Sequence, residues 1–482
     1  MVDKNYSSSD ASKVNQTDVD YQDPDKIPWM GDYIAADRFT PPAFLSERST
    51  QELEPRVISK DRYITREWHD REVEKLWKKT WQMACRENDI PEVGDQIEYE
   101  IAGISIIVVR SAPEEFHAFY NICRHRNTPL VDGCKHGKEI KCPFHGWSWS
   151  LDGKLKDIPC RWDFPGVKDD ENGLISVKAE TFNGFVFINM DPDSEPLENF
   201  IPEELRKQLL TWPQKRRWKA VHVAHVVPCN WKLGMEAFLE VYHVPIIHPE
   251  TVWYNGDYNT QYDNYGPHAR MMFPLSAPSP SMRGTVEPQQ CVDEILTGET
   301  SFGGGLAQAM GSEYAVPQMA PDDTLTDVRH RMADMLKKVY SMRTGKDMSG
   351  ISDVEALDGI QYTIFPNLQP WGGYFYPAVY RWRPNGNDPE SMIYEVMVLV
   401  DVPDDQPLPK DVQATYTPLG SQLTDAPGTK GAYGYLLDED FDQLRRIQKN
   451  LHSDQVDHNI YANYQERNIM NFHNHLEAAL DK

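Results

Sequence analysis

The sequence has 482 residues, which is long enough for two or three domains with well-buried cores. Its 49 basic and 74 acidic residues give a net charge of −25, which disfavours nucleic acid and anionic lipid as partners. Hydrophobic residues make up 40% of the chain and charged residues 26%, which excludes fibrous and mostly disordered proteins.

Residues 1–30 are rich in Ser, Asp, Asn and Lys and contain no apolar core segment. We therefore expect a flexible leader and not a secretory signal. The longest apolar runs, such as Phe185–Met190, are strand-sized and far shorter than a bilayer span. Seven cysteines, an odd number, do not suggest a disulfide framework, so we expect a cytoplasmic protein with no membrane segment.

The segment before residue 81 is expected to be helical. Trp68, Val73, Leu76, Trp77 and Trp81 recur near helical spacing, which predicts an amphipathic helix over 66–81. We expect the whole segment 31–80 to pack on a domain that comes later in the chain.

Residues 81–193 contain short runs rich in β-branched and aromatic residues, separated by turn signals such as Asp152-Gly153 and Asn183-Gly184. This pattern predicts a small all-β domain. The expected strands cover residues 97–101, 104–110, 116–122, 147–150, 174–180 and 185–189.

Residues 194–470 mix helical and strand-like stretches, which predicts an α+β domain, and residues 471–482 are expected to form a tail. Between them, residues 252–323 show little periodicity and are expected to form a lid or binding loop. The expected helices cover 201–211, 230–243, 326–342 and 436–451, and the expected strands cover 219–227, 360–365, 373–381 and 392–402.

The β domain contains Cys123-x-His125 and, sixteen residues later, Cys142-x-x-His145. Two Cys and two His side chains can hold a tetrahedral zinc ion or a 2Fe-2S cluster with mixed ligands. Zinc sites usually group like ligands, whereas each pair here is mixed. Cys134-x-His136 repeats the first spacing, but it lies too close to Cys142, so Cys134 is expected to be a loop cysteine near the site.

A second group of metal-ligand residues begins at Asn230-Trp231-Lys232 and includes Glu236, Glu240, His243 and His248. Spacings of four and three place residues 236, 240 and 243 on one face of the expected helix. Pro245 disfavours continued helix at Val244 and is expected to turn the chain so that both histidines converge.

These motifs resemble those of the Rieske non-haem iron oxygenases, in particular the catalytic alpha subunits of aromatic-ring-hydroxylating dioxygenases. The resemblance covers roughly residues 60–455. It implies an α+β chain in which an N-terminal all-β Rieske domain precedes a helix-grip catalytic domain, an antiparallel sheet with helices. It also implies that Cys123 and Cys142 bind one iron of a 2Fe-2S cluster while His125 and His145 bind the other.

The resemblance further implies a mononuclear Fe(II) held by His243, His248 and a downstream carboxylate. Glu439-Asp440 followed by Gln448 matches the family pattern, so Asp440 is the expected third ligand, with Asp438 and Asp442 as alternatives. Acidic residues also stabilise the first turn of a helix without binding metal. Glu240 is expected to connect His145 of one subunit to His243 of a neighbour, which requires an oligomer such as a homotrimer. Ala237 departs from the asparagine often found at its position.

The expected activity is hydroxylation, as cis-dihydroxylation, of an aromatic or other apolar molecule with O2 and electrons from a ferredoxin or reductase. A monooxygenase or oxidative demethylase acting on a similar substrate is the main alternative, and a separate beta subunit is compatible with either. A non-catalytic electron carrier or redox sensor is a further alternative, but it leaves His243, His248 and Asp440 without a role.

Overall fold

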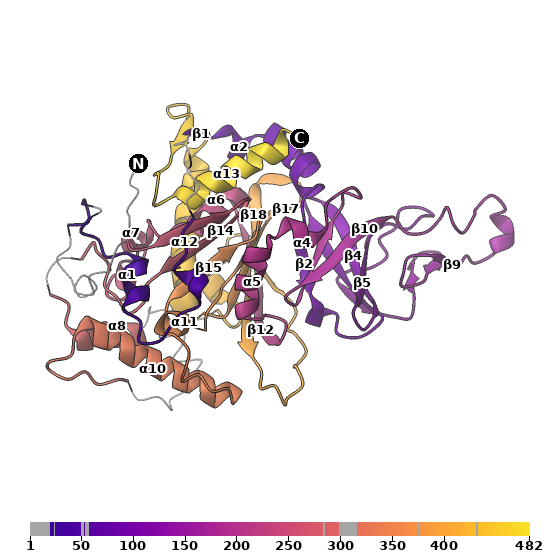
Figure 1. Ribbon diagram of the computed structural model, residues 1–482. Helices are drawn as coiled ribbons and strands as arrows, with labels where there is room; N and C mark the ends of the chain where they lie inside the picture. Colours follow the sequence, from indigo (N-terminus) through magenta and orange to yellow (C-terminus); the bar gives the residue numbers. More distant parts are fainter. Residues whose placement is uncertain are drawn as a thin grey trace.

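The protein is described from a computed structural model. The structure describes residues 20–23, 25–49, 53, 57–282, 285–297, 316–374, 376–429 and 432–482. In Figure 1 the β-rich part lies on the right and the mixed part, with most of the helices, lies on the left.

The β domain is built on a seven-stranded antiparallel sheet in the order β2-β11-β10-β5-β4-β3-β6. A small sheet, β7-β8-β9, lies on the arm that projects to the right in Figure 1. The strands are β2 (Gln82–Arg86), β3 (Asp95–Ile101), β4 (Ile104–Ala112), β5 (Glu115–Tyr120), β6 (Cys134–His136), β7 (Ile140–Lys141), β8 (Ser148–Trp149), β9 (Leu155–Asp157), β10 (Ser176–Phe182) and β11 (Phe185–Asn189), with short turns η4 (Glu87–Asp89) and η5 (Arg161–Asp163).

The second domain contains a five-stranded sheet, β16-β17-β18-β12-β19, in which only the β12–β19 pair is parallel. A three-stranded antiparallel sheet, β13-β14-β15, lies beside it. The strands are β12 (Arg217–Val227), β13 (Gln261–Tyr265), β14 (His268–Phe273), β15 (Gly359–Thr363), β16 (Leu368–Pro370), β17 (Ala378–Asn385), β18 (Asp388–Asp401) and β19 (Thr415–Thr417).

Helices surround these sheets (Figure 1), and together the two domains have the expected α+β architecture of an all-β domain followed by a helix-grip domain. The helices are α4 (Leu197–Phe200), α5 (Glu203–Thr211), α6 (Trp231–Ala237), α7 (Val244–Ile247), η6 (Pro249–Thr251), α8 (Pro288–Thr297), α10 (Leu325–Thr344), α11 (Asp353–Leu357), η7 (Leu423–Asp425), α12 (Ala432–Asn450) and α13 (Arg467–Leu480).

The segment before the β domain packs on the second domain. Strand β1 (Val57–Ser59) pairs with β20 (His458–Ile460) near the end of the chain. The expected helix over 66–81 is shorter, because a regular helix ends at Glu72 and a wider π turn follows to Trp77. The other elements here are α1 (Met30–Ala35), η2 (Ala43–Leu45), α2 (Asp61–Ile64), α3 (Arg66–Glu72) and η3 (Val73–Trp77).

Four further sequence-based expectations were wrong at least in part. The helix expected over 230–243 ends at Ala237, and the stretch expected to be a long loop contains β13, β14 and α8, although residues 298–315 of it lie outside the described part. The expected tail is instead the C-terminal part of α13, whose Phe472, His473 and Leu476 are buried. Cys134 lies on strand β6 and not in a loop.

A buried ion pair and hydrogen bonds from a buried guanidinium join the two domains. Arg86 of β2 pairs with Asp411, with Nε and Oδ2 3.0 Å apart, and Arg381 of β17 donates to the carbonyl oxygens of Met83 and Ala84. Since removing one partner would leave a buried charge unpaired, these contacts hold the β domain firmly on the larger sheet.

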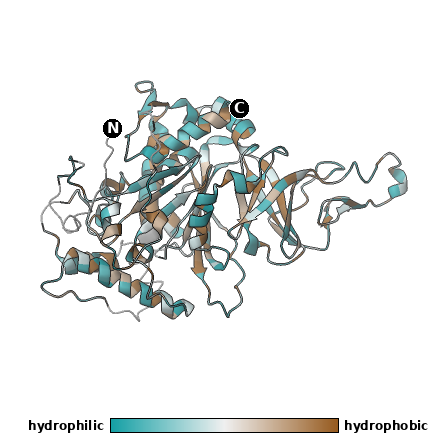
Figure 2. Cartoon of the chain, in the orientation of Figure 1, coloured by the Kyte–Doolittle hydropathy of each residue, from teal (hydrophilic) through white to brown (hydrophobic). Residues whose placement is uncertain are grey.

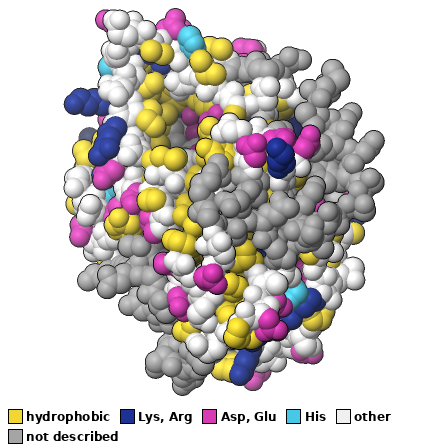
Figure 3. Space-filling model, turned by 90° about the vertical axis from the view of Figure 1, so that its left-hand side faces the viewer, with side chains coloured by type: hydrophobic (Ala, Val, Ile, Leu, Met, Phe, Trp, Pro, Cys, Tyr) yellow, Lys and Arg dark blue, Asp and Glu magenta, His cyan; other side chains and the backbone are white. Residues whose placement is uncertain are grey.

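Hydrophobic residues concentrate on the inner strands, while the outer helices carry both hydrophilic and hydrophobic residues (Figure 2). Figure 3 shows the opposite end from the projecting arm, where hydrophobic side chains gather between acidic ones. In the described part of the chain, none of the helices combines the length and the apolar character that crossing a bilayer requires.

Candidate metal centres and substrate cavity

Two loops of the β domain bring the four expected cluster ligands together. Cys123 and His125 follow β5, and Cys142 and His145 lie in the turn between β7 and β8. The rings of His125 and His145 have centroids 4.7 Å apart, and the two buried cysteine side chains are within hydrogen-bonding reach of each other. One pair of thiols and one pair of imidazoles is the arrangement that a Rieske cluster needs.

The chemistry of these donors fits such a cluster. Burial raises the pKa of the Cys123 thiol, whereas at Cys142 the effect of burial is outweighed by hydrogen bonds from the backbone amides of Phe144 and His145, so its pKa lies below the usual value. His125 stacks on Trp147, and its Nδ1 atom is buried without a hydrogen-bond partner in the described structure. A buried imidazole nitrogen without a partner suits a metal ligand.

The Asn230-Trp231-Lys232 segment fixes the start of α6. The Asn230 side chain caps the helix by accepting from the Lys232 amide at 3.0 Å, and the Asn230 amide donates to Gln448 Oε1 of α12 at 2.8 Å. The Trp231 indole and the Lys232 ammonium both donate to the buried Glu72 carboxylate. These three residues are therefore anchors that hold α6 against α3 and α12.

The chain leaves the helical path at Phe238, which places Glu240 and His243 in an irregular turn. Both the Tyr242 amide and the His243 amide donate to the Glu240 carboxylate, so its side chain stabilises this turn in place of a helix. We expected from the sequence that Pro245 would turn the chain, but it does not. It lies in the first turn of α7, where its missing N–H costs nothing.

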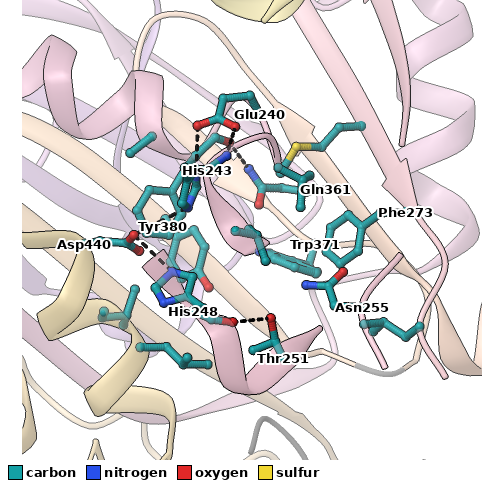
Figure 4. A pocket seen from close by; sticks show the side chains of 18 of the residues that line it. Glu240, His243, His248, Thr251, Asn255, Phe273, Gln361, Trp371, Tyr380 and Asp440 are labelled. Carbon is teal, nitrogen blue, oxygen red and sulfur yellow. Dashed lines mark hydrogen bonds and ion pairs between the residues drawn. The ribbon is translucent and has the colours of Figure 1, made fainter. Parts of the chain in front are cut away.

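Helix α7 separates His243 from His248 and directs both imidazoles toward α12. Oδ1 of the buried Asp440 lies 3.4 Å from His243 Nε2 and 3.1 Å from His248 Nε2 (Figure 4). Ligand atoms of all three residues lie within 4.8 Å of one another. Two imidazole nitrogens and one carboxylate oxygen match the facial triad of non-haem Fe(II) sites.

A second carboxylate orients each imidazole. Glu240 Oε1 lies 2.5 Å from His243 Nδ1, and Glu439 Oε2 lies 2.8 Å from His248 Nδ1. Since each Nδ1 is engaged, the Nε2 atoms are the ones that face Asp440. Carboxylate partners of this kind fix the tautomer and the ring orientation of histidine ligands.

In the triad, the carboxylate of Asp440 and the imidazoles of the two histidines stabilise each other's charged forms. Burial raises the pKa of Asp440, but the imidazoles of His248 and His243 outweigh it and bring the pKa down to about 2. Burial lowers the pKa of His248, but Asp440 and Glu439 outweigh it and bring the pKa up to about 9. The site is therefore organised to hold a positive charge next to Asp440.

The other acidic candidates have structural partners elsewhere. Asp438 accepts from the Leu423 and Thr424 amides, and Asp442 pairs with Arg445 while its side chain is 49% exposed. Glu236 does not share a face with His243, because its carboxylate accepts hydrogen bonds from Tyr63 and Tyr461 and contacts His473.

A cavity of about 110 Å³ opens beside the triad. Its walls are mostly aromatic and aliphatic, and among the described residues that line it none is Lys or Arg (Figure 4). The lining residues are Ala237, Phe238, Glu240, Val241, His243, Val244, His248, Thr251, Tyr254, Asn255, Met271, Phe273, Leu275, Gln361, Trp371, Tyr380, Leu436, Leu437 and Asp440.

Most of the apolar and polar residues that line the cavity beside the triad were not predicted from the sequence. Tyr254 and Asn255 lie in a stretch without periodicity, and Gln361, Trp371 and Tyr380 come from β15 to β17. No local pattern marks them, because the cavity forms only when these strands pack against α6 and α7. For Glu439, the sequence did offer a signal: it stands next to Asp440, so a contact between Glu439 and His248 could have been expected.

Family models match most of the chain. Residues 211–482 match the model described as ring hydroxylating alpha subunit (catalytic domain), and residues 80–168 match the model described as Rieske [2Fe-2S] domain.

Curated relatives match a smaller part. The carnitine monooxygenase oxygenase subunit of Escherichia coli (strain K12) is 33% identical over 189 residues, which are 39% of this chain and 50% of the relative. The biphenyl 2,3-dioxygenase subunit alpha of Rhodococcus jostii (strain RHA1) is 28% identical over 217 residues, 42% of this chain and 44% of the relative. The chain thus spans about half the length of the curated relatives it matches.

Solved structures share the fold over nearly the whole chain. A quaternary ammonium Rieske monooxygenase in complex with L-carnitine has a TM-score of 0.61 at 16% identity, covering 89% of this chain and 97% of its own. Naphthalene 1,2-dioxygenase with indole bound has a TM-score of 0.60 at 16% identity, covering 89% and 94%.

Proposed function

Since the chain belongs to the family of ring-hydroxylating alpha subunits, we propose that it is the oxygen-activating subunit of a Rieske oxygenase that oxidises a small, largely apolar molecule. The observation that carries the proposal is the triad of His243, His248 and Asp440 at the wall of an apolar cavity. We assign residues 81–193 to the Rieske domain and residues 194 onward to the catalytic domain, including α13.

The metal-binding residues form two groups with different roles. Cys123, Cys142, His125 and His145 hold the 2Fe-2S cluster, and His243, His248 and Asp440 hold Fe(II). A cluster held by the first four residues would supply single electrons, and an iron held by the triad would supply O2 activation beside the substrate. Glu240 and Glu439 keep the imidazoles oriented, and the apolar walls exclude water and position the substrate.

We propose monooxygenation, as hydroxylation or oxidative demethylation, as the reaction. This replaces the sequence-based expectation of cis-dihydroxylation, because carnitine monooxygenase subunits are among the most similar curated relatives, at up to 33% identity. Dihydroxylation of an aromatic ring is the second candidate, and the similarity to biphenyl 2,3-dioxygenase and the aromatic walls of the cavity favour it.

The cavity favours an uncharged or cationic substrate over an anionic one. The charged residues among its described lining are Glu240, Asp440 and the two histidines, so a carboxylate substrate would meet no Lys or Arg there. Aromatic walls can also bind a quaternary ammonium group through cation–π contacts. An apolar body is nevertheless the property that most of the lining residues would recognise.

Electrons come from a ferredoxin or reductase, and transfer between the two centres occurs between subunits of a homotrimer. Inter-subunit electron transfer is described for a related quaternary ammonium Rieske monooxygenase. In this chain, Phe144 next to His145 is 59% exposed and Ile246 close to His243 is 75% exposed, so both centres have an apolar side chain at the surface that a neighbouring subunit can cover.

Isotope labelling tests the reaction. The protein is supplied with a surrogate reductase, ¹⁸O2 and a panel of methyl ethers, alkylbenzenes, benzylic alcohols, primary amines and methylammonium compounds, and products are analysed by mass spectrometry. Incorporation of one ¹⁸O atom, or loss of a methyl group as formaldehyde, supports monooxygenation. Two ¹⁸O atoms in one product support dihydroxylation, and iron-loaded protein that oxidises no compound in the panel contradicts the proposed function.

A further inference from the structure

Two side-chain amides line the mostly aromatic and aliphatic walls of the cavity. Gln361 lies on β15, and Asn255 lies in the loop after η6. The Oε1 atom of Gln361 and the Oδ1 atom of Asn255 are both buried and have no hydrogen-bond partner in the described structure. Buried polar atoms are normally paired, so each of these two oxygens requires an explanation.

The orientation of the Gln361 amide is fixed by its nitrogen. Nε2 donates to the Phe238 carbonyl oxygen at 2.6 Å, and since a carbonyl accepts only, the nitrogen must be on that side. The side chain is 1% exposed, and Figure 4 shows it between His243 and Trp371. Its Oε1 atom is therefore held in place at the cavity wall close to the metal triad.

A neighbouring glutamine shows that this arrangement is specific to position 361. Gln369 of β16 donates to the same Phe238 carbonyl at 3.0 Å, but its Oε1 atom accepts from the Trp382 indole at 2.7 Å. Both ends of Gln369 are satisfied within the protein, whereas Gln361 has a free acceptor. Because Ala237 brings no side-chain amide to the cavity, Gln361 and Asn255 supply the amide groups that line it.

We propose that Gln361 Oε1, with Asn255 Oδ1, selects substrates that donate a hydrogen bond, so that the substrate is an apolar molecule bearing a hydroxyl, amine or amide N–H group near the oxidised carbon. This inference rests on the proposed function. A group without a donor, such as a hydrocarbon or an ether, would bury both oxygens unpaired, which typically reduces affinity by roughly 5-fold to 100-fold. A quaternary ammonium group has no N–H and would depend on the aromatic walls instead.

Equilibrium dialysis with matched probes tests the proposal without turnover. Benzyl alcohol and ethylbenzene have nearly the same shape, but only the alcohol donates a hydrogen bond. Benzyl methyl ether accepts without donating, and benzyltrimethylammonium carries a quaternary cation. Dissociation constants are measured for wild-type protein and for Gln361→Met, each loaded with iron and cluster, and the ratio of the ethylbenzene constant to the benzyl alcohol constant is compared between them.

In Gln361→Met this ratio should fall by roughly 5-fold or more, while the ratio of the ethylbenzene constant to the ether constant changes less than about threefold. Met271→Leu alters the same cavity wall without changing a polar atom, so it should keep the wild-type ratio. Asn255→Leu should lower the ratio in the same direction and serves as the test if Gln361→Met does not fold. A comparison of ratios separates a role in selection from a general loss of structure.

The proposal would be overturned if the ratio of the ethylbenzene constant to the benzyl alcohol constant were unchanged in both amide variants. It would also be overturned if benzyltrimethylammonium were the only probe whose affinity depends on Gln361. These outcomes are distinct from failure of the proposed function. Selective binding without any oxygenation would contradict the function but not the role of Gln361, and oxygenation with no preference for donors would contradict only the role of Gln361.

Discussion

Asp440 Oδ1 lies 3.1 Å from His248 Nε2, although 191 residues separate the two in the sequence. The contact is possible because α12 packs against the start of α6, where Gln448 accepts from the Asn230 amide. Within this arrangement Glu240 and Glu439 hold the Nδ1 atoms of the two histidines. The packing of α12 on α6 therefore determines the geometry of the proposed metal site.

Glu439→Gln should weaken iron binding without abolishing it, because the His248 ring loses its charged partner but keeps a hydrogen-bonding one. Loss of such a partner typically costs 10-fold to 100-fold in metal affinity. Iron affinity measured by competition with a chelator checks the prediction. Asp442→Asn, on the exposed side of the same helix, is the control and should bind iron as wild type does. Equal affinities in all three proteins would exclude a role for Glu439.

Glu240→Gln should slow electron transfer from the cluster to the iron by about tenfold or more, since the bridge proposed between His145 and His243 loses its charge. Rapid mixing of the reduced protein with O2 and a substrate, followed at the absorbance of the cluster, gives the rate. Glu240→Asp, which keeps the charge, should retain more of it. If cluster oxidation in Glu240→Gln were as fast as in wild type, the bridge would be refuted.

Ile246→Glu should weaken the oligomer and lower turnover together, because it places a charge on an apolar side chain at the proposed subunit interface. Solution mass and activity are measured over a range of protein concentrations. Ile460→Glu is a matched control, since Ile460 of β20 is 77% exposed and Ile246 is 75% exposed. An active monomer in any of these proteins would contradict inter-subunit transfer.

Asp257 should make the protein less stable as the pH rises. Burial raises its pKa to about 7, so the folded state binds a proton that the unfolded state releases near its ordinary value of 3.8. The stability contributed by this proton is fully present below pH 3.8 and is lost as the pH rises through 7. The loss is on the order of 4 kcal/mol.

Asp257→Asn should remove this dependence, because the amide is neutral throughout. Urea-unfolding midpoints at pH 5 and pH 8 are compared, and the variant should gain on wild type at the higher pH. Parallel changes in the two proteins would show that Asp257 does not titrate in this range.

Several strands and the candidate metal-binding motifs could be predicted from local patterns in the sequence. Strand β11 has the expected bounds, 185–189, because five consecutive buried residues flanked by turns leave little choice. The cluster loops could be identified because their ligands are close in sequence and specific in spacing. The family models confirm the two-domain architecture that these motifs implied.

Features that depend on tertiary contacts could not be predicted from the sequence. The helix over 230–243 was predicted from its spacing, but Glu240 uses its carboxylate to bind backbone amides and so ends the helical path. The partners of Glu236 lie in α2 and α13, and Gln361 donates to Phe238, which directly follows α6, so all of these contacts join residues far apart in the sequence. Side-chain partners at such separations leave no periodic signal.

Iron content tests the central claim, that one chain holds a two-iron cluster and a separate iron at His243, His248 and Asp440. We expect about three irons per wild-type chain and about two in Asp440→Asn, with the cluster spectrum unchanged. Asp442→Asn should contain three, as wild type does. Two irons in all three proteins would rule out the separate iron site, and zinc in place of the cluster would rule out the Rieske centre.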